Sequence, residues 1–132
     1  MMKRLFHFLM LLVCYGAATA FSGESETTEI PPVPTPGLVT MLDLGANKCV
    51  PCKMMAPIIE ELEKEYAGRA SIIFIDVWQY REQAQRFGIN SIPTQIFYDK
   101  EGKEVNRHVG FMDKESIAAL FEKLGVSKPA VQ

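Results

Sequence analysis

The stretch Lys48-Cys49-Val50-Pro51-Cys52-Lys53 decides the fold, because it stands where an apolar segment gives way to a helical pattern. Residues 38–44 are apolar nearly throughout, which predicts a central strand covered on both faces. Residues 50–66 carry apolar side chains at helical spacing, and Pro51 suits the first turn of a helix, where a residue without an N–H is tolerated. The expected inward face of this helix comprises Met54, Met55, Ile58, Ile59 and Leu62. The two cysteines are therefore predicted at the junction of a buried strand and a helix.

Strand and helix patterns alternate downstream of this junction. The turn residues at 99–102 predict an antiparallel hairpin, and Asp113 is placed to cap the last helix. A helical crossover makes the first two strands parallel. We therefore expect an α/β domain over residues 38–126, with a mixed four-stranded sheet and helices on both faces, followed by a short tail at 127–132. The further predicted strands lie at 70–77, 94–98 and 103–109, and the further helices at 79–87 and 114–124.

The first twenty residues have the layout of a secretory signal peptide. Two basic residues precede an apolar run over 5–13, and residues 18–20 form a small-x-small cleavage site. The run is shorter than the roughly 20 residues that a transmembrane helix needs. A competing interpretation makes Cys14 the lipidated cysteine of a bacterial lipoprotein. We expect a soluble exported protein, periplasmic in location, that begins at residue 21.

A proline-rich arm follows the signal peptide at residues 21–37. Four of its residues, at 31, 32, 34 and 36, are prolines that alternate with small residues. Prolines at this density favour extended polyproline II and block both helix and central strand. We expect a tether or extended arm, and a plain linker with no binding role is the simplest interpretation.

The charge of the mature chain argues against a nucleic-acid partner. Residues 1–20 hold two basic and no acidic residues, so the 14 basic and 16 acidic residues of the whole chain become 12 and 16 after cleavage. A mildly acidic domain lacks the clustered Lys and Arg that bind phosphate backbones. Cleavage also removes Cys14, so only Cys49 and Cys52 remain of the three cysteines.

The spacing of Cys49 and Cys52 suits redox exchange or metal binding better than structural cross-linking. A bridge between residues three apart closes a very small loop and stabilises the fold little. Cys49 lies at a helix start, where free N–H groups and the helix dipole favour the thiolate that attacks disulfides. Cys52 lies one turn further in and is expected to resolve the mixed disulfide. Asp43, the one acid in the preceding strand, is the candidate acceptor for the Cys52 proton.

Four motifs in the same order make the chain resemble the thioredoxin family over residues 38–124. They are the run 49–57 with its internal proline, Asp43 six residues before the first cysteine, the run 92–94, and the run 109–111. The resemblance implies a thioredoxin-like fold without its usual first strand and helix, and a monomer that acts on disulfide-containing proteins. It implies no cofactor beyond the Cys49/Cys52 pair. It also implies that Pro93 follows a cis bond and faces the disulfide, and that substrate contacts come from Val50, Pro51, Ser91, Ile92, Thr94 and Gly110.

The departures from the family pattern bear on specificity and on the direction of electron flow. Lys48 and Gly45 stand where the family usually has tryptophans. Trp78 is expected to serve packing, and the alternative is that it lends an aromatic surface in their place. The pair Val50-Pro51 resembles that of periplasmic reductant-relay domains and lacks the histidine of strongly oxidising relatives. We therefore expect a reductase that receives electrons from a membrane reductant transporter and passes them to protein disulfides, including apocytochrome cysteines in cytochrome c biogenesis.

Three other functions stay open from the sequence. The same dithiol chemistry would serve a periplasmic oxidant or isomerase. Cys49 and Cys52 would also serve as two thiolate ligands in a copper or zinc carrier, with the other ligands supplied by carboxylates or a second chain. His108, the one histidine of the mature chain, is expected at the surface of the last strand. The third alternative is a non-catalytic binding module tethered by the arm.

Overall fold

The computed structural model describes residues 29–128, which hold four strands and three helices. The expected signal peptide, the first part of the arm, the alternative lipidation site at Cys14 and the end of the tail lie outside these residues. The described residues contain no strand or helix before β1. The elements are β1 (Val39–Gly45), α1 (Val50–Glu65), β2 (Ala70–Asp76), α2 (Arg81–Arg86), β3 (Thr94–Tyr98), β4 (Glu104–Val109) and α3 (Lys114–Lys123).

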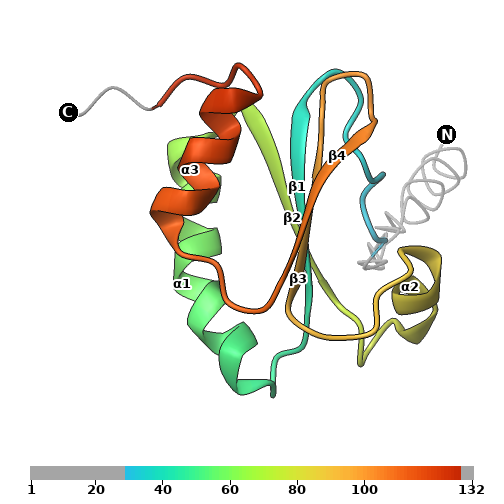
Figure 1. The fold of residues 1–132 in the computed structure, drawn as a ribbon. Helices are drawn as coiled ribbons and strands as arrows, with labels where there is room; N and C mark the ends of the chain where they lie inside the picture. Colours follow the sequence, from blue (N-terminus) through green and yellow to red (C-terminus); the bar gives the residue numbers. More distant parts are fainter. Residues whose placement is uncertain (1–28, 129–132) are drawn as a thin grey trace, which may run out of the picture.

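The sheet has the strand order β2-β1-β3-β4, as Figure 1 shows. Strand β1 pairs in parallel with β2, while β1 with β3 and β3 with β4 are antiparallel. The predicted crossover and hairpin are therefore both confirmed. Every residue of β1 is buried, as its nearly continuous apolar sequence predicted, because β1 lies between two strands and under helices on both faces.

Two apolar clusters cover the two faces of the sheet. Helices α1 and α3 pack on one face, where Met55, Phe97 and Phe121 are fully buried. Helix α2 lies on the other face, where Leu42, Leu44 and Ile96 form the centre of the second cluster. The alternation of β1 side chains sends Val39 and Met41 to the first cluster and Leu42 and Leu44 to the second. The same alternation places Asp43 on the face that α1 covers.

Helix α1 buries a narrower stripe than the sequence predicted. Its buried residues are Cys52, Met55, Ile59 and Leu62, whereas Met54 is 54 % exposed. The prediction that Met54 faces inward is wrong, because the buried stripe follows steps of three and four residues from Cys52 and Met54 falls outside these steps.

Two helix boundaries follow from local hydrogen bonds. Helix α2 begins at Arg81 instead of residue 79, because the Asp76 carboxylate accepts the backbone N–H groups of Trp78 and Gln79 and holds them in a turn. Helix α3 begins after Asp113, whose carboxylate accepts the N–H of Ser116 as predicted. None of the helices in the described residues is both long and apolar enough to cross a membrane.

The described part of the arm lies against the domain. Val33 is buried in the second apolar cluster, and the hydroxyl of Thr35 is 2.6 Å from that of Ser71 on β2. Further upstream, Glu29 and Ile30 help to line a hollow of about 180 Å³ together with Asn47 of the turn before α1. The arm therefore enters the domain close to the turn that carries the cysteines.

Candidate active site

The two cysteines lie at the N-terminus of α1 and form a disulfide in this structure. Cys49 is the N-cap residue, and its sulfur accepts the backbone N–H of Cys52 at 3.3 Å. Cys49 is half-buried, whereas Cys52 is only 5 % exposed. A nucleophile that meets solvent and a second sulfur protected behind it are the arrangement that stepwise disulfide exchange requires.

Gly45 lets the backbone at the end of β1 pass close to the inner sulfur. A Cβ atom at this position would lie 3.3 Å from the Sγ of Cys52 and 3.1 Å from the ring of Phe74. The Phe74 ring on β2 therefore lies beside the place where the family usually has a tryptophan side chain. Phe74 could not be singled out from the sequence, because its position beside Gly45 depends on the parallel pairing of β1 with β2.

Asp43 is fully buried on β1, beneath the start of α1. Its Oδ1 accepts a hydrogen bond of 2.7 Å from the side-chain amide of Gln95, while its Oδ2 has no hydrogen-bond partner in the described part of the chain. Burial raises the pKa of Asp43 to about 6, and the bond from Gln95 opposes part of this shift. A carboxyl group that titrates near neutral pH can accept and return a proton.

Gln95 was missed by the sequence interpretation. It lies directly opposite Asp43 in the register of β1 and β3, so that both side chains lie on the same face of the sheet. Gln95 is fully buried, and within residues 29–128 its own Oε1 also lacks a hydrogen-bond partner. An amide in an otherwise apolar, buried strand was the available signal, but the pairing register was needed to connect it to Asp43.

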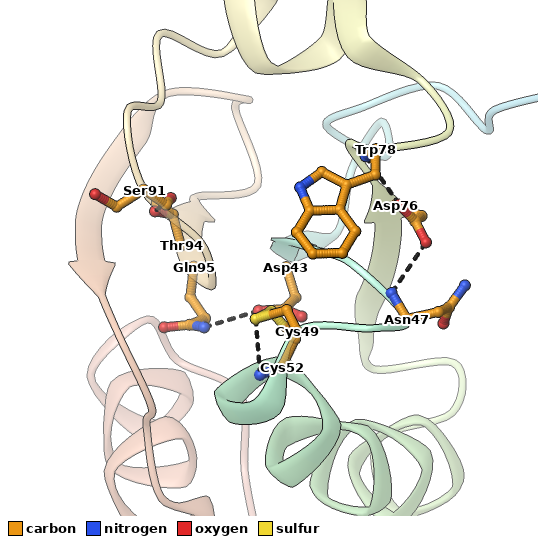
Figure 2. The surroundings of a disulfide bond; sticks show 9 residues. All are labelled: Asp43, Asn47, Cys49, Cys52, Asp76, Trp78, Ser91, Thr94 and Gln95. Carbon is orange, nitrogen blue, oxygen red and sulfur yellow. Dashed lines mark hydrogen bonds between the residues drawn. A yellow bond between two sulfur atoms is a disulfide. The ribbon is translucent and has the colours of Figure 1, made fainter.

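Asp76 ties the turn that precedes Cys49 to the loop after β2. Its Oδ2 accepts the backbone N–H of Asn47 at 3.0 Å, and its Oδ1 accepts the N–H of Trp78 at 2.9 Å (Figure 2). Burial alone would raise the pKa of Asp76, but the N–H groups of Asn47, Trp78 and Gln79 and the side chain of Asn47 together lower it below the usual range. The carboxylate is therefore ionised at neutral pH and holds two loops in a fixed relation.

Trp78 is 54 % exposed, so the expectation that it serves packing is wrong. The hydrogen bond from its N–H to Asp76 holds its backbone in the turn, and the side chain then projects away from the core. Figure 2 shows the indole pointing from this loop toward Cys49. The aromatic surface that Lys48 fails to provide thus comes from a different loop.

The segment before β3 reaches the same end of the sheet as the disulfide, because Thr94 pairs with Leu44 near the end of β1. The Ile92–Pro93 peptide bond is cis, as the family resemblance implied. The carbonyl of Pro93 accepts the N–H of Gly110 at 2.8 Å, which ties this segment to the end of β4. Gly110 has a φ of +102°, a conformation that side chains with a Cβ rarely adopt.

The residues expected to contact a substrate differ in accessibility. Val50 is 73 % exposed, Pro51 and Ser91 are exposed, and Ile92 is half-buried. Thr94 is buried, and its hydroxyl donates a 2.7 Å hydrogen bond to the carbonyl of Ser91. The Thr94 side chain therefore shapes the loop from beneath.

The charged residues of the described region do not form a metal centre. No group of three or more His, Cys, Asp or Glu side chains converges anywhere in residues 29–128. His108 is half-buried on β4, and its ring lies 3.0 Å from the carbonyl of Phe111. The chemistry that the described residues support is thiol–disulfide exchange through Cys49 and Cys52.

Comparison with known proteins identifies relatives across most of this domain. The family model described as Thioredoxin matches residues 36–123. A thioredoxin of Staphylococcus saprophyticus is 44 % identical over 85 residues, which cover 64 % of this chain and 81 % of the relative. A thioredoxin of Staphylococcus haemolyticus is 42 % identical over the same length and with the same coverage.

Solved structures show the same fold. The thioredoxin-2 described as a component of the malaria parasite's protein secretion machinery is 27 % identical, with a TM-score of 0.61 over 65 % of this chain and 82 % of that one. The exposed lipoprotein thioredoxin of Streptococcus pneumoniae is 23 % identical, with a TM-score of 0.58 over 66 % of this chain and 85 % of that one. The fold, the disulfide at the helix N-terminus and the family match together show that the chain belongs to the thioredoxin family and is a thiol–disulfide oxidoreductase.

Proposed function

We propose that this protein is an exported reductase that transfers two electrons from the Cys49/Cys52 dithiol to disulfides of other proteins. The observation that carries the direction is the pair Val50-Pro51 between the cysteines, which supplies no cationic ring. A histidine there would stabilise the Cys49 thiolate of the reduced form and would make the disulfide a stronger oxidant. Without it, the reduced form donates electrons more readily.

The reaction begins with the reduced dithiol. The Cys49 thiolate attacks one sulfur of the substrate disulfide, forms a mixed disulfide and releases the other substrate sulfur as a thiolate. Cys52 then attacks the Cys49 sulfur, which releases the second substrate thiolate and restores the disulfide seen here. Two electrons pass to the substrate, whose two sulfurs take up the two protons that the dithiol loses.

Asp43 accepts the Cys52 proton in the second step. Cys52 is almost fully buried, so its deprotonation in this apolar site needs a nearby base. The pKa of Asp43 is raised to about 6 by burial, so this carboxylate is ionised at pH 7 and remains basic enough to accept a proton. Its Oδ1 already accepts the bond from Gln95, so Oδ2, which has no partner among residues 29–128, is the oxygen proposed to receive the proton.

An extended substrate segment binds along the loop before Pro93. Among residues 29–128, the hydrogen bonds leave the backbone N–H and carbonyl of Ile92 unpaired. These two groups can pair with a substrate chain as an additional strand would. Ser91 and Val50 add exposed side chains to the proposed substrate-binding surface. A single monomer forms the whole of this proposed site.

The sequence pattern of residues 1–20 supports export, and the resemblance of Val50-Pro51 to periplasmic reductant-relay domains supports the choice of electron donor. We propose cleavage after Ala20, a periplasmic location and reduction of Cys49–Cys52 by a membrane reductant transporter, with apocytochrome cysteines among the substrates. The pneumococcal neighbour is an exposed lipoprotein, and at 23 % identity it supports the fold alone. Sequencing the N-terminus of the secreted protein tests cleavage, and retention of a Cys14→Ser variant in membranes would contradict the lipoprotein alternative.

The reduction potential measured against glutathione tests the proposed direction. A value near that of thioredoxin, about −270 mV, is the expected result, and a value near −120 mV would make the protein an oxidant. A Cys52→Ala variant should retain substrate proteins as mixed disulfides through Cys49. The matched control is the double variant with Cys49→Ser, which should retain none.

A further inference from the structure

Trp78 lines a hollow beside the loop that is proposed to bind the substrate chain. This hollow has a volume of about 420 Å³, and its lining combines apolar side chains with the polar groups of Arg81, Asn90 and Ser91. Trp78 and Ile92 are among the apolar residues that line it. Figure 2 shows Trp78 and Ser91 on separate loops above the disulfide. The further apolar lining comes from Ala84 and Ile89.

The backbone of Trp78, which lines the hollow, is tied to the turn that precedes Cys49. The Asp76 carboxylate bonds the N–H of Trp78 with one oxygen and the N–H of Asn47 with the other. Because Asn47 lies two residues before Cys49, the same carboxylate holds the backbone of Trp78 close to the turn that precedes the nucleophile. Trp78 is 54 % exposed in this position, so much of its aromatic surface is open to a bound chain.

We propose that this hollow is the binding site for an aromatic side chain of the substrate polypeptide, next to the cysteine that Cys49 attacks, and that Trp78 determines this preference. The inference rests on the proposed strand-like binding at Ile92. A chain paired with Ile92 presents its side chains to alternate sides, so a residue near its cysteine meets the hollow that Ile92 borders. Indole and guanidinium groups both stack on aromatic rings, and Trp78 and Arg81 provide one of each.

The test uses two disulfide-linked peptides that differ only in one residue beside the cysteine, phenylalanine in one and serine in the other. The full chain without its signal peptide is compared with Trp78→Ala, Trp78→Phe and the control Val105→Ser, which removes an exposed apolar side chain from β4. In Trp78→Ala, KM for the phenylalanine peptide should rise about tenfold with kcat unchanged. KM for the serine peptide should stay the same, and Trp78→Phe should restore most of the difference.

Two outcomes would overturn the inference. One is an equal change for both peptides in Trp78→Ala, and the other is a slower reaction with hydroxyethyl disulfide, which has no side chain to bind. Because Trp78 is the only tryptophan of the chain, its fluorescence should also change on binding the phenylalanine peptide and not the serine peptide.

Equilibrium capture of the two peptides by Cys52→Ala separates this inference from the proposed function. The amount of captured peptide measures how well the protein recognises each peptide, and it does not depend on the direction of electron flow. An oxidising potential with the phenylalanine preference intact would remove the reductase proposal and leave the subsite. A reducing potential without the phenylalanine preference would remove the subsite and leave the reductase proposal.

Discussion

The two sides of the Cys49–Cys52 disulfide differ in polarity and in exposure to solvent. On the inner side, Asp43 and Gln95 are fully buried polar groups, and each keeps one oxygen without a hydrogen-bond partner among residues 29–128. On the outer side, Val50 and Trp78 are apolar side chains that are 73 % and 54 % exposed. Each side thus departs from the usual rule of burial.

This difference separates two tasks of the same disulfide. The inner side moves a proton, which requires a titratable group shielded from water. The outer side meets another polypeptide, which requires apolar surface that the fold leaves uncovered. Changes on the inner side should therefore alter rates, pH dependence and stability, whereas changes on the outer side should alter the choice of substrate.

The largest effect is expected from the nucleophile itself, which stands between the two sides. Cys49→Ser should reduce the rate of insulin disulfide reduction by roughly a thousandfold or more, because a serine hydroxyl cannot form the mixed disulfide. Cys52→Ala should still form mixed disulfides, but it should accumulate them because no second sulfur releases the substrate. Turnover by Cys49→Ser near that of the natural chain would contradict the assignment of the two sulfurs.

Asp43→Asn should give the second largest effect and should act on rate and stability in opposite directions. Removal of the base should slow release of the mixed disulfide by about a hundredfold at pH 7. The same change should stabilise the oxidised protein, because a carboxyl whose pKa is raised by burial binds its proton more tightly in the folded state. That stabilisation is absent below pH 4, grows as the pH rises through about 6, and reaches up to about 3 kcal/mol at pH 7.

Chemical denaturation of the oxidised protein at pH 4 and pH 7 measures this effect. The free energy of unfolding of the natural chain should fall between these pH values, while that of Asp43→Asn should change less. The stopped-flow rate of mixed-disulfide release should fall in the natural chain below pH 6, where Asp43 is protonated. A pH profile that is identical in both proteins would place the proton acceptor elsewhere.

Gln95→Leu tests the inner side further and should have a smaller effect on the rate of mixed-disulfide release. Loss of its hydrogen bond removes the one contribution that lowers the pKa of Asp43, so the midpoint of the release step should move up by about one pH unit. Gln83→Leu is the matched control, because Gln83 is also a buried glutamine but lies on α2. It should leave the midpoint unchanged, and an equal shift in both variants would deny Gln95 its specific role.

Val50→Ser tests the outer side and should have the smallest effect. KM for a polypeptide disulfide should rise about threefold, because one exposed apolar contact is lost. The rate with hydroxyethyl disulfide, the pH midpoint and the stability should stay as they are. Val105→Ser again serves as the control, and a change in the pH midpoint of Val50→Ser would show that the two sides are not independent.

The sequence predicted most of the fold because its signals are local. The buried strand before Cys49, the helix opened by Pro51 and the cap at Asp113 depend on neighbouring residues, and the structure has all three. The errors at Met54 and Trp78 came from reading apolar character as burial. Exposure depends on which face a helix turns inward and on where a loop is tied, and both are set by distant contacts.

The candidate site was predicted in part for the same reason. Cys49, Cys52 and Asp43 could be found by motif and spacing, and the cis bond before Pro93 came from the family resemblance. Gln95 and Asp76 could not be found, because each acts through a partner on another strand or loop. The register of β1 with β3 brings Gln95 to Asp43, and register is a property of the assembled sheet.

The position of the arm determines which end of the domain lies nearest to the preceding part of the chain. Glu29 and Ile30 share a hollow with Asn47, so the chain leaves the folded unit beside its disulfide. Residues 21–28 can span at most about 28 Å when fully extended. If residue 21 were attached to a membrane surface, this segment would keep the disulfide close to that surface. The protein would then meet only substrate proteins that lie near the membrane.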